Sequence, residues 1–148
     1  ARSMVNLAIG PDLTKSFVDP CCGVGTVVIA ALGLGLDVKG FDINRLVACQ
    51  AMDNLKAMGW PPVVSIGDVH QLGGHWDAAV LDLPYGLFTP VKPGQVAALI
   101  RRARRIAHRV VFLAFEDLRT VIEEAEFRIV DQCQVTRGRL VRHVYLCV

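Results

Sequence analysis

The chain has 148 residues, which fits a single domain with a hydrophobic core. Hydrophobic residues make up 53% of it and the mean hydropathy is +0.41, yet no apolar run reaches the roughly 18 residues that span a membrane. The composition therefore predicts a sheet buried on both faces, and the net charge of +2 is too small to indicate a polyanionic partner by itself.

Short apolar runs alternate with helix-like segments, after a lead-in segment at residues 1–15. Strands are indicated by the short apolar runs, and helices by apolar residues three and four positions apart. In chain order the pattern predicts a strand at 16–19, a helix at 26–34, a strand at 37–42, a helix at 44–58, strands at 63–66 and 77–82, a helix at 95–108, a strand at 109–115, a helix at 117–125, and strands at 127–135 and 140–148. Asn44 and Asp117 are expected to cap the helices that they precede.

Alternation of strands and helices is typical of a mostly parallel, doubly wound sheet. The last two strands flank the sequence TRGR, and the turn expected at Arg137-Gly138 makes them an antiparallel hairpin. We therefore expect one α/β, Rossmann-like domain over residues 1–148, with a seven-stranded, mostly parallel sheet and a C-terminal antiparallel hairpin. In such a sheet, ligands bind at the carboxyl ends of the strands.

Four of the predicted parallel strands end at or next to an aspartate, namely Asp19, Asp42, Asp68 and Asp82. One aspartate would be an ordinary turn residue. Four at one edge would repel one another unless they were spread out and supplied with hydrogen-bond donors, so a polar ligand along this edge is the better interpretation. Asp19 could also cap the helix that follows it, and Asp68 could belong to an ordinary turn.

The turn Gly23-Val24-Gly25 lets the backbone come close to a ligand. The dinucleotide fingerprint GxGxxG would need a third glycine where Val28 stands, so binding of NAD is disfavoured. Asp42 is placed to accept hydrogen bonds from both hydroxyls of a ribose, and Asp68 can accept one from the exocyclic amine of adenine. A ligand with a ribose, an adenine and a positively charged end fits these acids, and S-adenosylmethionine is such a ligand.

Several motifs together resemble the class I S-adenosylmethionine-dependent methyltransferases, and within them the THUMP-associated tRNA guanine-N2-methyltransferases and related RNA methylases. VDPCCGVGTVVIAA is similar to their glycine-rich motif, which is close to DPFCGSGT in this branch. GFDIN, NLKAMG and GDVHQL follow in the order and spacing of the branch, and DLPYG is similar to its catalytic motif DPPYG. ARSMVNLA also resembles the segment that precedes the first motif.

The sequence departs from the family pattern in three places. Leu83 replaces the first proline of the catalytic motif, and Val24 stands where serine or threonine is common. The N-terminal THUMP region, which helps the family to hold tRNA, has no counterpart among these residues, so the resemblance concerns the catalytic domain.

The resemblance implies a cytoplasmic enzyme that methylates the exocyclic 2-amino group of a guanine in RNA, with tRNA as the expected substrate and S-adenosylmethionine as the cofactor, without a metal. The residues implied in cofactor binding are Asp19, Pro20, Cys21, Gly23, Gly25, Thr26, Asp42, Ile43, Asp68 and Val69. The residues implied in catalysis are Asp82, Leu83, Pro84 and Tyr85. Asp82 and the Leu83 carbonyl would accept hydrogen bonds from the amine, and Tyr85 would stack on the base.

The remaining features have ordinary explanations. The arginines of RRARR at 101–105 lie on the polar side of an amphipathic helix and are interpreted as a solvated face. The four histidines share no metal-ligand spacing and the five cysteines include no CxxC pair, so we expect neither a metal site nor disulfides. An amino-methyltransferase acting on DNA or ribosomal RNA is an alternative hypothesis, and so is a non-catalytic scaffold with the same fold. Nothing in the sequence indicates an oligomeric state.

Overall fold

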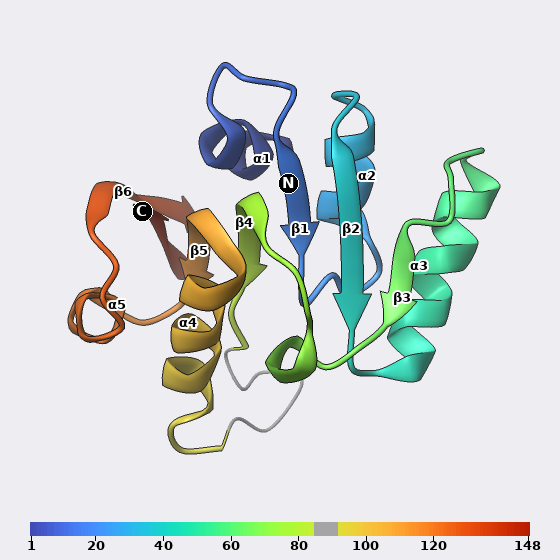
Figure 1. The fold of residues 1–148 in the computed structure, drawn as a ribbon. Coiled ribbons are helices and arrows are strands. Elements are labelled where there is room, and N and C mark those ends of the chain that lie inside the picture. The colour runs from blue at the N-terminus through green and yellow to red at the C-terminus, as the bar shows by residue number, and fades with distance from the viewer. Residues whose placement is uncertain (85–91) are drawn as a thin grey trace.

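The computed structural model describes residues 1–84 and 92–148, which form a seven-stranded sheet with helices on both faces (Figure 1). The helices are α1 (Arg2–Ile9), α2 (Thr26–Leu32), α3 (Arg45–Ala57), α4 (Gln95–Ile106) and α5 (Arg119–Glu124), with a 3₁₀ turn, η1 (Val69–Gln71). The strands are β1 (Ser16–Asp19), β2 (Asp37–Asp42), β3 (Val64–Ile66), β4 (Trp76–Asp82), β5 (Ala107–Ala114), β6 (Ile129–Arg137) and β7 (Leu140–Cys147).

The strand order in the sheet is β3-β2-β1-β4-β5-β7-β6. Strands β1 to β5 are parallel, and β7 is antiparallel to both β5 and β6. This arrangement confirms the predicted α/β fold with its C-terminal hairpin. The strand order reverses between β1 and β4, and ligands of open parallel sheets bind in the crevice at such a reversal, outside the carboxyl ends of the strands.

The parallel strands are buried on both faces. In β1, Phe17 and Val18 are both fully buried, and successive residues of a strand point to opposite faces. Phe17 belongs to the core shared with α1, α2 and α3, whereas Val18 belongs to the core shared with α4 and α5. In Figure 1, α4 lies in front of the sheet and α2 lies behind it. Two apolar layers explain the high hydrophobic content. Within the part of the chain that the structure describes, no helix is both long and apolar enough to cross a membrane.

The lead-in segment contains a helix, α1, to which the sequence pattern assigned no element. Its residues Val5, Ala8 and Ile9 are buried and lie three and four positions apart, as on one face of a helix. They pack against the same face of the sheet as α2. Arg109 of β5 donates a hydrogen bond to the carbonyl of Leu7 (3.3 Å). The lead-in segment is therefore part of the folded core.

Most predicted boundaries differ from the structure by only a few residues. Asn44 caps α3 as expected, because its side chain accepts hydrogen bonds from the N–H groups of Leu46 (3.0 Å) and Val47 (3.4 Å). The helix α4 ends at Ile106, earlier than predicted. Ala107 is already extended (φ −147°, ψ 147°) and begins β5, so the helix passes directly into the strand.

The prediction that Asp117 caps α5 is wrong, because Leu118 occupies the capping position. The Asp117 carboxylate instead accepts hydrogen bonds from the N–H of Arg119 (3.1 Å) and from the hydroxyl of Tyr145 (3.0 Å). The tyrosine lies on β7, so this carboxylate ties the start of α5 to the hairpin.

The hairpin extends beyond the rest of the sheet. Strands β6 and β7 pair as far as Arg137 and Leu140, but β7 pairs with β5 only as far as His143, which lies opposite Ala114. Residues 140–142 and their partners in β6 therefore project past the carboxyl end of β5.

Candidate active site

The carboxyl ends of β1, β2, β3 and β4 surround a pocket of about 400 Å³. The pocket is lined by Pro20, Cys21, Asp42, Ile43, Asn44, Gly67, Asp68, Val69, His70, Asp82, Pro84, Gln95 and Leu99. The lining residues that the sequence pattern did not indicate are Asn44, Gly67, His70, Gln95 and Leu99. Gln95 and Leu99 lie one turn apart in α4, and only the packing of that helix shows that its first turns close the pocket.

The other predicted site residues that the structure describes are not among those that line the pocket, but Asp19 and Leu83 each adjoin a lining residue in the chain. Asp19 and Leu83 are buried, with 4% and 2% of their surfaces exposed. The glycine turn at 23–25 follows the lining residue Cys21, and Thr26 is the first residue of α2. Tyr85 lies outside the described residues, so its proposed stacking role stays a prediction.

The glycine turn is fixed against the end of β2. Gly23 and Gly25 adopt φ of 54° and 88°, in the left-handed region that favours glycine. The N–H of Gly23 donates to Asp42 Oδ2 (2.9 Å). A Cβ at position 25 would lie 3.2 Å from the Cβ of Ala51 in α3. At position 25 conformation and close packing both favour glycine, whereas at position 23 only the conformation does.

Asp42 joins the turn to the pocket. Its Oδ1 accepts a hydrogen bond from the N–H of Asn44 (2.8 Å), and its Oδ2 accepts the one from Gly23. Each carboxylate oxygen has two lone pairs, so an oriented Asp42 can still accept hydrogen bonds from the hydroxyls of a ligand.

Asp19 is a buried carboxyl group that directly precedes the lining residue Pro20. Burial raises the pKa of Asp19 to about 7, and the negative charges of Asp42 and Asp82 also raise it, against a hydrogen bond from the N–H of Cys21 that lowers it (3.3 Å). Within residues 1–84 and 92–148, Asp19 has no ion-pair partner. A cationic ligand in the pocket would supply the missing positive charge.

Asp68 lies in a local turn, and one arginine of α4 holds the segment that follows it. Its Oδ1 accepts a hydrogen bond from the N–H of His70 (2.9 Å) and so caps η1. The half-buried Arg102 donates through Nε to the carbonyl of Val69 (2.9 Å) and through Nη2 to the carbonyl of Leu72. The interpretation of RRARR as a solvated face is therefore wrong for Arg102, whereas the other three arginines are exposed.

Asp82 lies at the border between the pocket and the hairpin. It ends β4, and its oxygens accept hydrogen bonds from Nη2 of Arg142 in β7 (2.7 and 3.0 Å). The next residue, Leu83, is buried in the same apolar core as Leu99 and Ala114. Its N–H donates to the carbonyl of Leu113 (3.0 Å). A leucine at this position therefore extends the pairing of β4 and β5 by one residue.

The lining fits a ligand that is polar and cationic. Asp42, Asp68 and Asp82 contribute carboxylates, and none of the described lining residues is a lysine or an arginine. Ile43, Val69 and Leu99 supply apolar surface for a flat ring. A phosphate would meet repulsion here. The carboxylates instead match the ribose hydroxyls, the adenine amine and the positively charged sulfonium group of S-adenosylmethionine.

Comparison with known proteins agrees with this chemistry. The family described as RMKL-like, methyltransferase domain matches residues 1–142. The chain belongs to this family. It is 31% identical over 160 residues to a tRNA (guanine(10)-N2)-dimethyltransferase of Pyrococcus abyssi, covering 99% of the chain and 47% of that protein. It is 32% identical over 111 residues to the protein of the same name from Methanothermobacter thermautotrophicus, covering 73% of the chain and 33% of that protein.

Solved structures show the same fold. TrmN from Thermus thermophilus superposes with a TM-score of 0.81 at 18% identity, covering 99% of this methyltransferase domain and 47% of that chain. The domain thus spans about half the length, or less, of these relatives. It is a methyltransferase domain with S-adenosylmethionine as its cofactor, as the sequence predicted. Across the described ranges, no three His, Cys, Asp or Glu side chains are grouped to hold a metal ion.

Proposed function

We propose that this domain methylates the exocyclic 2-amino group of a guanine in tRNA. The observation that carries the proposal is the position of Asp82, which ends β4 at the border of the acid-lined pocket and begins a sequence similar to the catalytic motif DPPYG. The names of the two relatives, both tRNA (guanine(10)-N2)-dimethyltransferases, support guanine and tRNA as the targets. We propose further that residues 1–148 act as a single catalytic domain.

The proposed cofactor contacts follow from the lining. Asp42 would accept the ribose hydroxyls, and Asp68 would accept the adenine amine between the apolar side chains of Ile43 and Val69. The turn with Gly23, Gly25 and Thr26 would pass beside the amino-acid end, together with Pro20 and Cys21, above the buried Asp19. When bound, S-adenosylmethionine supplies the methyl group on a positively charged sulfur.

The catalytic residues then have to position a weak nucleophile. The lone pair of the guanine amine is delocalised into the ring, so hydrogen bonds from its N–H groups to Asp82 and to the Leu83 carbonyl would orient it toward the cofactor. Pro84 fixes its own φ and restricts Leu83 to extended conformations. Tyr85 would stack on the base, an interaction of about 1–3 kcal/mol. Positioning of this kind accounts for a large part of the rate enhancement when an enzyme catalyses a reaction between two bound molecules.

Arg142 sets the orientation in which Asp82 meets the amine. The pair is half-exposed, with 30% of the Arg142 side chain and 46% of the Asp82 side chain accessible. A carboxylate has about four acceptor sites, so Asp82 can keep its bonds to Arg142 and still accept one from the substrate. Arg142 is thus a positioning residue in the proposed mechanism.

The substrate is tested by incubating the protein with bulk tRNA, ribosomal RNA and DNA in the presence of radiolabelled S-adenosylmethionine, followed by nucleoside analysis. We expect the label in N2-methylguanosine from tRNA. Label confined to adenine or cytosine of DNA, or to ribosomal RNA, would overturn the proposed substrate and favour the alternative amino-methyltransferases.

The role of Asp82 is tested by Asp82→Ala. We expect the rate of methyl transfer to fall about 100-fold or more, because the amine loses its orienting acceptor, while the dissociation constant of S-adenosylmethionine measured by calorimetry changes less than threefold. The exposed aspartate Asp53 of α3 provides the control variant Asp53→Asn, which should change neither quantity. Retained transfer in Asp82→Ala would refute the assignment, and absence of saturable cofactor binding in the unaltered protein would favour the scaffold hypothesis.

A further inference from the structure

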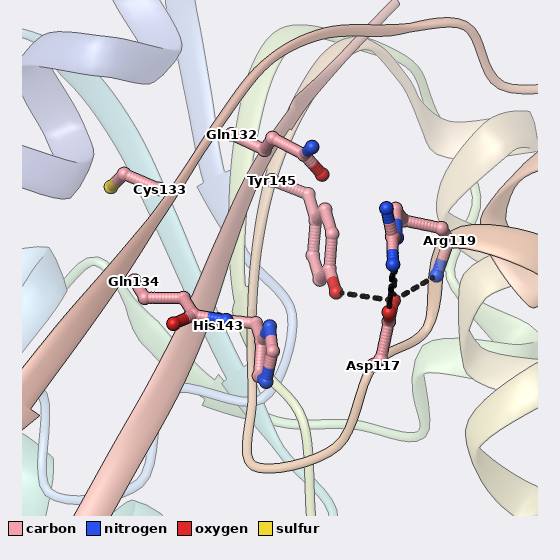
Figure 2. A pocket seen from close by; sticks show the side chains of 7 residues that line it. All are labelled: Asp117, Arg119, Gln132, Cys133, Gln134, His143 and Tyr145. Carbon is pink, nitrogen blue, oxygen red and sulfur yellow. Dashed lines mark hydrogen bonds and ion pairs between the residues drawn. The ribbon is translucent and has the colours of Figure 1, made fainter.

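A second pocket, of about 250 Å³, opens on the hairpin (Figure 2). It shares no lining residue with the acid-lined pocket. Its wall comes from β6, β7 and the loop that leads into α5. The proposed chemistry at Asp82 makes no use of it.

The base of this hairpin pocket is aromatic. The rings of His143 and Tyr145 are parallel, with an interplanar angle of 6° and centroids 6.1 Å apart. Tyr145 is 1% exposed, and its hydroxyl donates to Asp117 and accepts from the N–H of Leu118 (3.2 Å). The tyrosine is therefore rigid and supports the half-buried imidazole of His143 on one side. The imidazole offers a flat surface for stacking.

Two glutamines stand beside these rings. In the ladder of β6 and β7, Gln132 lies opposite Tyr145 and Gln134 lies opposite His143, so each glutamine shares a sheet face with its aromatic partner. Both glutamines are exposed. Each amide offers two donors and an acceptor. Figure 2 shows Gln132 beside Tyr145 and Gln134 beside His143, whereas the thiol of Cys133 points away from the pocket.

The charges in the hairpin pocket compensate each other. Arg119 donates through Nε to both oxygens of Asp117 (3.0 Å each). Hydrogen bonds from Arg119 hold the pKa of Asp117 well below its usual range, so the carboxylate stays ionised and paired. The other polar groups that line the pocket are two amides, the imidazole of His143 and the hydroxyl of Tyr145, and Cys133 also contributes to the lining. A flat, uncharged group with hydrogen-bonding edges matches this pocket better than a phosphate does.

The hairpin pocket lies beside the proposed catalytic residues, on the side of β4 away from the acid-lined pocket. The N–H of Leu83 bonds to Leu113, and the next residue, Ala114, lies opposite His143. Neighbouring strands lie about 4.8 Å apart, so two strand spacings put the Cα atoms of His143 and Leu83 about 10 Å apart. The exposed Arg139 at the hairpin turn faces the same end of the sheet.

We propose that the hairpin pocket binds the base of a single-stranded nucleotide near the target guanine, by stacking on His143 and by hydrogen bonds to Gln132 and Gln134. Unstacked RNA bases are recognised through such aromatic faces and polar edges. The inference rests on the proposed function, because it takes RNA as the substrate. The pocket holds the strand while the neighbouring guanine reaches Asp82.

A kinetic test uses His143→Ala and Gln134→Ala with unmodified bulk tRNA. We expect the KM for tRNA to rise at least fivefold in each variant, the kcat to stay within twofold, and the dissociation constant of S-adenosylmethionine to stay unchanged. His143→Phe keeps a flat ring and should retain most of the affinity. His75→Ala removes an exposed histidine that directly precedes β4 and serves as the matched control. His75 lies at the amino end of this strand, whereas the hairpin pocket lies toward the carboxyl ends. An unaltered KM in His143→Ala would overturn the proposal.

A second test needs no catalysis. The thiol introduced by Gln134→Cys lies in the hairpin pocket, while the exposed native Cys49 of α3 provides a reference outside it. We expect bulk tRNA to slow alkylation by iodoacetamide at position 134 at least fivefold and to leave alkylation of Cys49 unchanged. Methylated tRNA without protection at position 134 would overturn the pocket assignment alone. Failure of all tRNA methylation would overturn the proposed function and this inference together.

Discussion

Asp19 is a carboxyl group that the fold buries next to the acid-lined pocket. Its pKa is about 7 in the folded chain, whereas an aspartate in an unfolded chain titrates near 3.9. Between these pH values the folded protein binds one proton more than the unfolded chain. The contribution of Asp19 to the free energy of unfolding therefore falls as the pH rises from about 4 to about 7, and this contribution is level above that range.

Asp19→Asn is expected to stabilise the protein at pH 8 and to have little effect near pH 4. The gain at pH 8 is at most about 4 kcal/mol, the free energy that corresponds to this change in pKa. Urea denaturation at the two pH values measures it. The same variant should bind S-adenosylmethionine more weakly, because it cannot provide a negative charge. Equal stability of both proteins at pH 8 would show that Asp19 is not destabilised by burial.

Leu83 shows what a motif comparison leaves out. Against the family pattern, a leucine in place of proline is only a departure. In the structure its side chain is buried among residues of α4 and β5, and its N–H bonds to Leu113. A proline has no N–H to donate. The sequence contains the motif, but the partner that makes leucine suitable lies 30 residues further on, in a strand whose register is a tertiary property.

At the scale of elements, one side chain of α4 holds the segment that carries Asp68. Arg102→Gln removes the hydrogen bonds to the carbonyls of Val69 and Leu72. We expect the affinity for S-adenosylmethionine to fall about five- to tenfold, since a charged hydrogen bond contributes roughly 1.5–3 kcal/mol and part of this loss affects the pocket. Calorimetry measures the change. Arg101→Gln alters an exposed neighbour and should match the unaltered protein. Equal losses in both variants would point to a general charge effect.

Periodicity predicted the parallel strands and their order along the chain, because buried strands are short and continuously apolar. It also placed Asp42, Asp68 and Asp82 at one pocket, since the carboxyl ends of parallel strands meet at one edge. It did not predict α1, whose apolar residues Val5 and Ile9 form too short a pattern to stand out. The contact of Asp82 with Arg142 joins residues far apart in sequence, and only the register of β5 and β7 brings them together.

For the whole molecule, α1 decides whether the first residues belong to the cooperative unit. Ile9→Ala is expected to lower the free energy of unfolding by about 2–5 kcal/mol, because Ile9 is 1% exposed and lies in the core. Leu13 is 52% exposed, so Leu13→Ala should change stability by less than about 0.5 kcal/mol. Urea denaturation of both variants measures the difference. A small effect of Ile9→Ala would place α1 outside the unit and would contradict one domain over residues 1–148.

The direct passage from α4 into β5 constrains how this family can vary in length. The first turns of α4 close the acid-lined pocket through Gln95 and Leu99, and the far end of β5 holds the backbone of Leu83. One stretch of chain, with no loop at Ile106–Ala107, thus connects the acid-lined pocket with the strand that holds Leu83. An inserted residue at this junction would shift either the helix or every pair in the strand. Insertions among homologues should therefore be found in the turns at the carboxyl ends of the strands rather than at this junction.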